Sequence, residues 1–257
     1  MTHGTLPVFE FYPAAHIEGS LPDGGYVPDT PIWATKVGPF LTTLQERAAT
    51  TQRSDISLGD KLAFVIENVV DAVEADTIVA LTEKMGYRPE APGISTPPGM
   101  RQNKTVHWVS DEALLGTIFE RISPHLPQVL DGAPLASKLS HRINMYRYDD
   151  NDVFNLHTDG DWPGYGLSAD TGRMVQWPSV YSKLTMLLYL NGHEDGIQGG
   201  ETYLYDQGDL KHAIAPKKGR ALFFRHGRER SSVLHGGARV TGSVSKYVAR
   251  INVLYGL

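Results

Sequence analysis

The chain has 257 residues, a formal net charge of −5 and no cysteine. With 41% hydrophobic and 21% charged residues it has the composition of a globular protein, which excludes a disordered or collagen-like chain. The absence of cysteine excludes a disulfide framework, a thiol nucleophile and a thiolate metal site, so a bound metal would need His, Asp or Glu ligands.

Charge and hydropathy also limit the partners. The acidic balance disfavours a general nucleic-acid binder, and two basic runs, 217–220 and 225–230, are interpreted as solvated loop edges rather than phosphate-binding patches. No apolar stretch is long enough to span a membrane, and the first residues lack the pattern of a signal peptide. We therefore expect a cytoplasmic protein without a membrane or nucleic-acid partner, and its oligomeric state stays open.

In chain order, the sequence predicts an extension followed by one domain. Residues 1–60 are rich in Pro, Gly and Thr and contain one helical candidate at 39–49, so we expect them to wrap over the core formed by 61–257. A strand is predicted at 62–70. Apolar residues at helical spacing predict helices over 74–85 and 111–122.

The chain changes character after Pro134, where short apolar segments alternate with turns that contain Gly, Asp or Pro. This pattern predicts strands at 139–148, 153–158, 182–190, 201–205, 220–225, 232–235 and 245–255. Evenly spaced short strands are typical of a barrel or jelly roll. We therefore expect a mainly β fold, a jelly roll with the α-helices packed on one side.

Two His-x-Asp pairs could contribute to a metal site. His157 and Asp159 stand at the end of a predicted strand, where residues i and i+2 project from one face. The competing pair, His193 and Asp195, lies in a Gly-rich connection where turn residues are expected. We therefore favour the first pair.

A third ligand is needed, and His235 is the best candidate because it also lies at a predicted strand end. Two His and one carboxylate on one face of an octahedral ion leave three positions open, as in non-heme Fe(II) oxygenases. The other interpretation, a core or surface histidine bonded to water, stays open from position alone.

Two strands carry polar residues on one face. In the last strand Lys246, Val248, Arg250 and Asn252 alternate with apolar residues, and their face is either solvated or the interior of a small barrel. A cation inside a barrel would need an anionic partner, which a dicarboxylate cosubstrate could supply. In the strand 182–190, Thr185 and Tyr189 share one face and satisfy either local hydrogen bonds or a ligand.

Several motifs stand in a familiar order: YRY, FNLHTDG, LTMLLYLN, GGET, GRALFF, LHGG and KYVARINVLY. Over about 62–257 the chain resembles the Fe(II)/2-oxoglutarate-dependent dioxygenases of the prolyl 4-hydroxylase-like group. The resemblance implies a double-stranded β-helix (a cupin-like jelly roll), with Fe(II), 2-oxoglutarate and O₂ as cofactor and cosubstrates and ascorbate as a further candidate. Residues 1–60 match no family.

The resemblance also assigns roles to single residues. It implies that His157, Asp159 and His235 are the catalytic iron ligands. The basic residue that grips the far carboxylate of 2-oxoglutarate falls on Lys246. Its offset from His235 is about one residue longer than in the prolyl hydroxylases, which leaves Arg250 as an alternative or second anion ligand. Further cosubstrate contacts are expected from residues on neighbouring strands, namely Tyr148, Tyr189 and Thr185.

The substrate is predicted less directly. The segment 160–181 is expected to be either a lid over the substrate or a loop that only caps the barrel. Four side chains are substrate candidates: Trp162, Arg173 and Trp177 in this segment, and Arg101 upstream.

The expected reaction is hydroxylation of a C–H bond in a small molecule, such as a free amino acid or related metabolite, with release of succinate and CO₂. The alternative is a peptidyl, prolyl-type hydroxylase. A different class of protein, a non-catalytic metal- or sugar-binding jelly roll, is the third hypothesis. Open access to the iron would favour a peptide, and a closed pocket lined by 160–181 would favour a metabolite.

Overall fold

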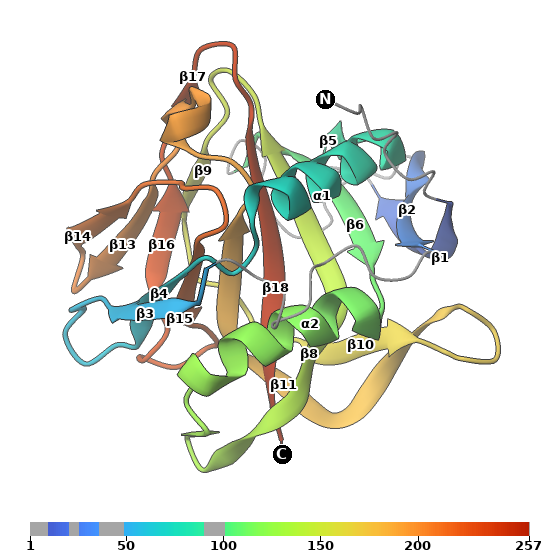
Figure 1. Ribbon diagram of the computed structural model, residues 1–257, viewed down its shortest axis with the longest axis horizontal. Helices are drawn as coiled ribbons and strands as arrows, with labels where there is room; N and C mark the ends of the chain where they lie inside the picture. Colours follow the sequence, from blue (N-terminus) through green and yellow to red (C-terminus); the bar gives the residue numbers. More distant parts are fainter. Residues whose placement is uncertain (1–9, 21–25, 36–48, 90–100, 257) are drawn as a thin grey trace.

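The computed structural model describes residues 10–20, 26–35, 49–89 and 101–256. Strands dominate these residues and two α-helices pack on one side of the largest sheet (Figure 1), so the predicted mainly β class is confirmed. The predicted helix at 39–49 falls almost entirely outside the described residues. None of the described helices is both long enough and apolar enough to cross a membrane.

The elements have the following bounds. The helices are α1 (Ala72–Met85) and α2 (Glu112–Ile122), with the short 3-10 helices η2 (Ser123–His125) and η3 (His193–Asp195). The first nine strands are β1 (Phe11–Ser20), β2 (Tyr26–Thr35), β3 (Gln52–Asp55), β4 (Ala63–Glu67), β5 (Arg88–Pro89), β6 (Lys104–Val109), β7 (Val129–Leu130), β8 (Ala133–Tyr148) and β9 (Phe154–His157). The others are β10 (Pro163–Leu167), β11 (Met174–Tyr189), β12 (Gln198–Gly199), β13 (Thr202–Asp206), β14 (Asp209–Ile214), β15 (Ala221–Arg225), β16 (Leu234–Gly237), β17 (Val240–Thr241) and β18 (Lys246–Gly256).

Two sheets face each other and form the jelly roll. The major sheet has the order β1-β2-β6-β8-β18-β11-β15-β4-β3, and the minor sheet the order β14-β13-β16-β9. Neighbours in the major sheet come from distant parts of the chain, so that β18 lies between β8 and β11. The long strands β8, β18 and β11 therefore form a rigid floor for the space between the sheets.

Each face of the major sheet has its own hydrophobic core. Side chains that include Trp108, Met186 and Ile251 pack against α1 and α2. A second, smaller cluster fills the space between the two sheets and includes Tyr189, Phe224 and Val248. Strand alternation explains this division, because successive side chains point to opposite faces.

The two helices begin where the sequence places their caps. The Asp71 side chain accepts a hydrogen bond from the Glu74 amide, and the Glu74 carboxylate accepts one from the Asp71 amide, which completes a capping box. The Asp111 side chain caps α2 by accepting a hydrogen bond from the Leu114 amide. The same Glu74 carboxylate receives two hydrogen bonds from Arg121 of α2, so one buried ion pair joins the helices.

The polar face of the last strand is inside the molecule. Lys246, Arg250 and Asn252 are all buried, which excludes the solvated interpretation and confirms the barrel-interior one. Their apolar neighbours on β18, such as Ile251 and Val253, lie in the core beneath the helices.

The segment 160–181 is largely a β-hairpin rather than an irregular loop. β10 pairs with the first half of β11, and β11 then continues into the major sheet beside β18. Ser179 lies at the bend between these halves, with a positive φ of 61°. β11 is therefore longer than the predicted strand at 182–190.

The N-terminal region contributes strands to both edges of the major sheet. β2 pairs in parallel with β6, and β3 pairs with β4 at the opposite edge. The sequence analysis assigned no strand to 1–60 or to β6. The strands within 1–60 lack regular alternation, and in β6 the alternation of Thr105 and His107 with Val106 and Trp108 extends over only four residues, so the period-2 signal is absent or short.

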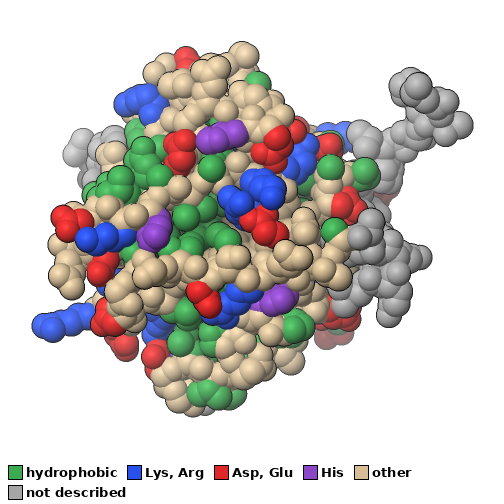
Figure 2. Space-filling model, turned by 60° about the vertical axis from the view of Figure 1, so that its left-hand side comes forward, with side chains coloured by type: hydrophobic (Ala, Val, Ile, Leu, Met, Phe, Trp, Pro, Cys, Tyr) green, Lys and Arg blue, Asp and Glu red, His purple; other side chains and the backbone are tan. Residues whose placement is uncertain are grey.

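The basic runs form ion pairs at the surface. Lys217 and Arg220 pair with Glu67, Lys218 pairs with Asp76 and Asp195, and Arg225 pairs with Asp131. On the face shown in Figure 2, positive and negative side chains alternate and neither sign forms an extended patch. This agrees with the interpretation of 217–220 as a loop edge. In the run 225–230, however, Arg225 and His226 are buried and only 228–230 are exposed, so the interpretation as a solvated loop edge is wrong for the first part of that run.

Candidate active site

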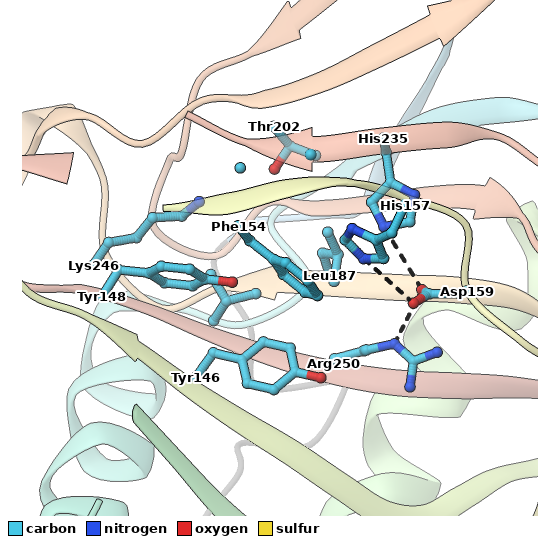
Figure 3. Close-up of a pocket in the computed structure, with 13 residues that line it drawn as sticks. Tyr146, Tyr148, Phe154, His157, Asp159, Leu187, Thr202, His235, Lys246 and Arg250 are labelled. Carbon is cyan, nitrogen blue, oxygen red and sulfur yellow. Dashed lines mark hydrogen bonds and ion pairs between the residues drawn. The ribbon is translucent and has the colours of Figure 1, made fainter. Parts of the chain in front are cut away.

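The minor sheet brings the three predicted metal ligands together. His157 on β9 and His235 on β16 are direct cross-strand partners, and Asp159 follows two residues after β9 ends. The Asp159 carboxylate oxygens lie 3.8 Å from Nε2 of His157 and 3.9 Å from Nε2 of His235. Among the described residues, these three form the one group of His, Asp or Glu side chains close enough to share a metal ion (Figure 3).

The outer nitrogens of both imidazoles are already engaged. Nδ1 of His157 lies 2.8 Å from the Asn155 carbonyl, and Nδ1 of His235 lies 3.1 Å from the Val233 carbonyl. A carbonyl can only accept, so each Nδ1 carries the proton and each Nε2 presents a lone pair toward Asp159. Fixing the tautomer in this way is the usual second layer of a histidine metal site.

Asp159 is held by a chain of hydrogen bonds. Its Oδ2 accepts from Thr185 Oγ1 at 2.6 Å and from Arg250 Nε at 3.1 Å. Because Thr185 donates its proton to the carboxylate, it accepts from Nδ1 of His226 at 2.8 Å. Nε2 of His226 then accepts from Ser182 Oγ, also at 2.8 Å. Thr185 therefore orients the Asp159 carboxylate, and its expected contact with the cosubstrate stays a prediction.

The protonation states suit a cation. Burial lowers the pKa of His157 to about 4 and also lowers that of His235, so both imidazoles are neutral at neutral pH. Burial alone would raise the pKa of Asp159, but the charge of Arg250 beside it and the neighbouring imidazoles outweigh burial and hold this pKa well below its usual range. Two neutral imidazoles and one carboxylate fit a divalent ion such as Fe(II).

A pocket extends from the three predicted ligands into the space between the sheets. Lys246 stands at its inner end, with its Nζ donating to the Gly200 carbonyl at 2.5 Å. The Nζ lies 5.2 Å from the Tyr148 ring and 5.4 Å from the Tyr189 ring. Apolar walls come from Phe154, Leu187 and Val248 among others.

Tyr148 and Tyr189 occupy different places around this pocket. Tyr148 lines the pocket, and its hydroxyl points into the space between Lys246 and the imidazoles (Figure 3). Tyr189 is fully buried behind the wall and its hydroxyl donates to Thr202 Oγ1 at 2.8 Å. Thr202 lines the pocket, so Tyr189 is connected to the pocket through its hydrogen bond to Thr202.

Gly200, the second residue of the GGET motif, has a backbone conformation that favours glycine. Its φ of +73° belongs to the left-handed region, and a Cβ there would lie 3.1 Å from Cδ of Lys246. A glycine therefore allows the β12–β13 connection to pass directly over the lysine.

A second cavity borders the site on the other side of Arg250. It is lined by Arg142, Asn144, Trp162, Tyr165, Arg250 and Asn252. The structure thus places Trp162, one of the substrate candidates, in a cavity next to the metal ligands.

The other substrate candidates have different surroundings. The Arg101 guanidinium lies over the Tyr146 and Phe154 rings, at the edge of the first pocket. Arg173 is exposed near the tip of the β10–β11 hairpin, and Trp177 packs against His141 and Lys138. Neither of the last two lines the pocket or the second cavity.

The competing pair, His193 and Asp195, forms hydrogen bonds and an ion pair around its own turn. Nε2 of His193 lies 3.0 Å from the Gly199 carbonyl, while Asp195 accepts from the Gly192 amide and pairs with Lys218. Their side chains stabilise the turn around η3.

Sequence reasoning did not identify Thr202, Tyr146, His226, Arg142 or Asn144 as site residues. Tyr146, Asn144 and Arg142 share one strand face with Tyr148, so alternation along 139–148 could have indicated them. No local pattern indicates Thr202 or His226, because only the folded sheets bring them near Tyr189 and Thr185.

Comparison with known proteins agrees with this geometry. Residues 143–254 match the family model described as the 2OG-Fe(II) oxygenase superfamily. No curated protein sequence matches the chain.

Two solved structures are similar in fold. One is the viral collagen prolyl hydroxylase of Paramecium bursaria Chlorella virus-1 in complex with 2-oxoglutarate, with a TM-score of 0.52 and 21% identity over 79% of this chain and 100% of that chain. The other is a prolyl hydroxylase from Trichoplax adhaerens in complex with a hypoxia-inducible-factor peptide fragment, with a TM-score of 0.51 and 17% identity over 76% of this chain and 83% of that chain.

The family match covers both histidines, the aspartate and the lysine, and the fold agrees with it independently. Residues 143–254 therefore match the 2OG-Fe(II) oxygenase superfamily, the described residues have a prolyl-hydroxylase-like fold, and these findings together support a dioxygenase that uses Fe(II), 2-oxoglutarate and O₂.

Proposed function

We propose that this enzyme hydroxylates a C–H bond of a residue within a peptide. The observation that carries the hydroxylase chemistry is the convergence of two neutral imidazoles and Asp159 beside a pocket that ends in a buried lysine. Bound Fe(II), 2-oxoglutarate and O₂ supply the oxidant, and 2-oxoglutarate leaves as succinate and CO₂.

The residues of this chain hold and orient the reactants. His157, His235 and Asp159 provide the three protein ligands on one face, which leaves the other positions for the cosubstrates. The apolar walls of the pocket exclude water from the reacting groups.

In this proposal Lys246, rather than Arg250, grips the far carboxylate of 2-oxoglutarate. Arg250 already donates to the metal ligand Asp159, whereas Lys246 lies four residues away along β18, a distance of about 13 Å in an extended strand. A five-carbon diacid that chelates the metal at one end extends away from it. Its other end therefore points toward Lys246.

Two observations favour a peptide as substrate. The two solved structures described above are prolyl hydroxylases, and one of them is in complex with a peptide fragment. In addition, an open groove of about 480 Å³ follows β9 and β16 next to the pocket, and Leu156 is 44% exposed there. An extended peptide fits such a groove better than a free metabolite does.

One observation favours the second candidate, a small-molecule hydroxylase. Trp162 and Tyr165 of the β10–β11 hairpin wall the second cavity beside Arg250, which gives the metal site a more enclosed flank. A free amino acid or related metabolite would fit there.

Succinate release with and without added substrate tests both candidates. Peptide and metabolite panels are each incubated with Fe(II), 2-oxoglutarate and O₂, and products are examined by mass spectrometry for the gain of one oxygen atom. We expect a peptide to stimulate succinate release and to gain oxygen. Stimulation by metabolites alone would instead establish the small-molecule candidate.

A further inference from the structure

The second cavity has a strongly cationic lining. We call it the arginine chamber and define it by Arg142, Asn144, Trp162, Tyr165, Arg250 and Asn252. Arg250 also lines the first pocket, so the arginine chamber adjoins the metal ligands directly. Neither similarity to known proteins nor the family match assigns it a ligand.

Strand register builds this lining. Arg250 of β18 lies opposite Asn144 of β8, and Asn252 and Arg142 follow on the same inner face of these strands. Lys246 also belongs to this face, at the other end of β18. The floor between the sheets therefore carries a cation on each side of the metal site.

The charges of the arginine chamber are only partly balanced. Arg250 donates through Nε to Asp159, and no other hydrogen bond of its guanidinium to a described residue is present. Arg142 forms neither an ion pair nor a hydrogen bond with the described part of the chain, and its Nε is buried. The Tyr165 ring lies 5.6 Å from its guanidinium carbon.

A neutral polar group in the same place is also unsatisfied. Asn252 is only 9% exposed, and its Oδ1 has no hydrogen-bond partner in the described residues. Buried polar atoms in folded proteins are nearly always paired, and an exception indicates an absent ion, water or ligand. The arginine chamber thus offers guanidinium donors next to an amide acceptor.

We propose that the arginine chamber binds a carboxylate of the substrate and so restricts the enzyme to carboxylate-bearing substrates. This inference rests on the proposed hydroxylase function. A guanidinium binds a carboxylate through two parallel hydrogen bonds, and an N–H group beside that carboxylate could donate to Asn252. The carboxylate belongs either to an acidic or C-terminal residue of a peptide or to a free amino acid.

The site then contains two anion sockets with separate roles. Lys246 takes the far carboxylate of 2-oxoglutarate, and Arg142 together with Arg250 takes that of the substrate. Because Asp159 contacts Arg250, a substrate held by this guanidinium lies next to a metal ligand. The target carbon is therefore close to the bound carboxylate.

Binding is measured with N-acetylglycine and N-acetylglycinamide, which differ in the carboxylate. The anaerobic protein is saturated with Fe(II) and 2-oxoglutarate so that the Lys246 pocket is filled, and tryptophan fluorescence is recorded because Trp162 lines the arginine chamber. The acid should bind at least about tenfold more tightly than the amide. A Trp162→Phe variant should lose the fluorescence change.

Three substitutions test whether N-acetylglycine binds in the arginine chamber. Arg142→Gln should remove the preference for the acid, and Arg142→Lys should keep part of it. Arg230→Gln, at an exposed position distant in sequence from the chamber strands, should keep all of it. Melting temperatures show that each variant is folded. Equal affinity for acid and amide in the wild type, or an unchanged preference in Arg142→Gln, would overturn the proposal.

Turnover distinguishes the two sources of the carboxylate. Peptides with Asp or Glu are compared with the Asn or Gln versions, and free amino acids with their amides. Whichever class is hydroxylated, peptide or free amino acid, the acid should have a KM at least about tenfold lower than that of its amide. Arg142→Gln should raise the KM for the acid and leave the KM for 2-oxoglutarate unchanged.

A spectroscopic signal tests the proposed hydroxylase function separately from the role of the arginine chamber. Anaerobic Fe(II) and 2-oxoglutarate should give a weak visible charge-transfer band that His157→Ala abolishes. Without the band the hydroxylase function fails. With the band but without discrimination between acid and amide, only the role of the arginine chamber fails.

Discussion

In the proposed function, Lys246 is the buried charge that binds the far carboxylate of 2-oxoglutarate. It is only 4% exposed, and its Nζ has a carbonyl, Gly200, rather than a carboxylate as its hydrogen-bond partner. Replacing it by methionine keeps the bulk but removes the cation. Lys246→Met should raise the KM for 2-oxoglutarate by about tenfold to a hundredfold, because a charge-assisted hydrogen bond is lost.

The control is Lys246→Arg, which keeps the charge and should retain part of the affinity. Steady-state succinate release against 2-oxoglutarate concentration measures both variants. If Lys246→Met has the wild-type KM and an Arg250 variant does not, Arg250 is the carboxylate anchor.

The same lysine predicts a pH dependence. Burial lowers its pKa from 10.5 to about 8, against the opposing charge of Glu201, with the Tyr148 and Tyr189 rings and the Gly200 carbonyl as its other neighbours. Only the protonated amine attracts the carboxylate, so the affinity for 2-oxoglutarate should be constant below about pH 8 and fall above it. Anaerobic titrations monitored by the charge-transfer band measure this.

The lowered pKa of Lys246 in the folded protein also makes the free energy of unfolding depend on pH. Between about pH 8 and pH 10.5 the unfolded chain binds the Lys246 proton and the folded chain does not, so this residue makes the free energy of unfolding rise with pH there. Lys246→Arg should remove the contribution of Lys246 to the pH dependence of 2-oxoglutarate affinity and to that of the free energy of unfolding. A wild-type affinity that stays flat through pH 9 would contradict the assignment.

Thr185 positions a metal ligand through one hydroxyl. Thr185→Val keeps the shape but removes the donor to Asp159 and the acceptor for His226. Affinity for Fe(II) should fall about tenfold to a hundredfold, as expected when an outer partner of a metal ligand is lost. Thr185→Ser retains the hydroxyl and should bind Fe(II) like the wild type, which competition with a chelator measures.

At the scale of elements, strand alternation accounts for what the sequence predicts best. The alternation in 246–255 divides β18 into an apolar face beneath the helices and a polar face in the site, and the structure confirms this division. The strand ends that carry His157 and His235 follow from the same pattern. Their direct pairing does not, because sheet register between distant strands depends on the whole fold.

The elements that sequence analysis missed have different causes. β6 is almost fully buried, and its alternation of Thr105 and His107 with Val106 and Trp108 is too short to stand out from the mixed sequence around it. The β10–β11 hairpin contains Pro and several Gly, which favour a loop, yet Gly166 is needed because a Cβ there would lie 2.3 Å from the Trp177 ring. Tertiary packing thus explains residues that local propensity opposes.

The junction of α1 and α2 predicts a stability effect that spares the site. Glu74 accepts two hydrogen bonds from Arg121 in a pair whose side chains are 3% and 0% exposed. Glu74→Gln leaves the arginine charge buried without its carboxylate, which should lower the free energy of unfolding by about 3 kcal/mol. For a chain of this size the melting temperature should fall by roughly 10 °C.

An exposed position on the same helix pair provides the comparison. Glu120→Gln on α2 should leave the melting temperature unchanged, and both variants should keep the wild-type KM for 2-oxoglutarate. Loss of cosubstrate affinity in Glu74→Gln would show that the helices also control the pocket.

For the whole molecule, the metal site lies where the two sheets meet. His157 and His235 come from the minor sheet, while Thr185 and Arg250 of the major sheet hold Asp159. A metal bound to these ligands connects both sheets, and the unfolded chain has no such site. Binding should therefore stabilise the fold as a whole rather than one loop.

The size of this stabilisation follows from mass action. Fe(II) at one hundred times its Kd should raise the free energy of unfolding by about 2.7 kcal/mol, or the melting temperature by roughly 5–10 °C. Anaerobic thermal melts with and without Fe(II) measure it. His235→Ala should lose the shift, whereas His193→Ala, which removes the histidine of the competing pair, should retain it. Retention of the full shift by His235→Ala would mean that the metal binds elsewhere.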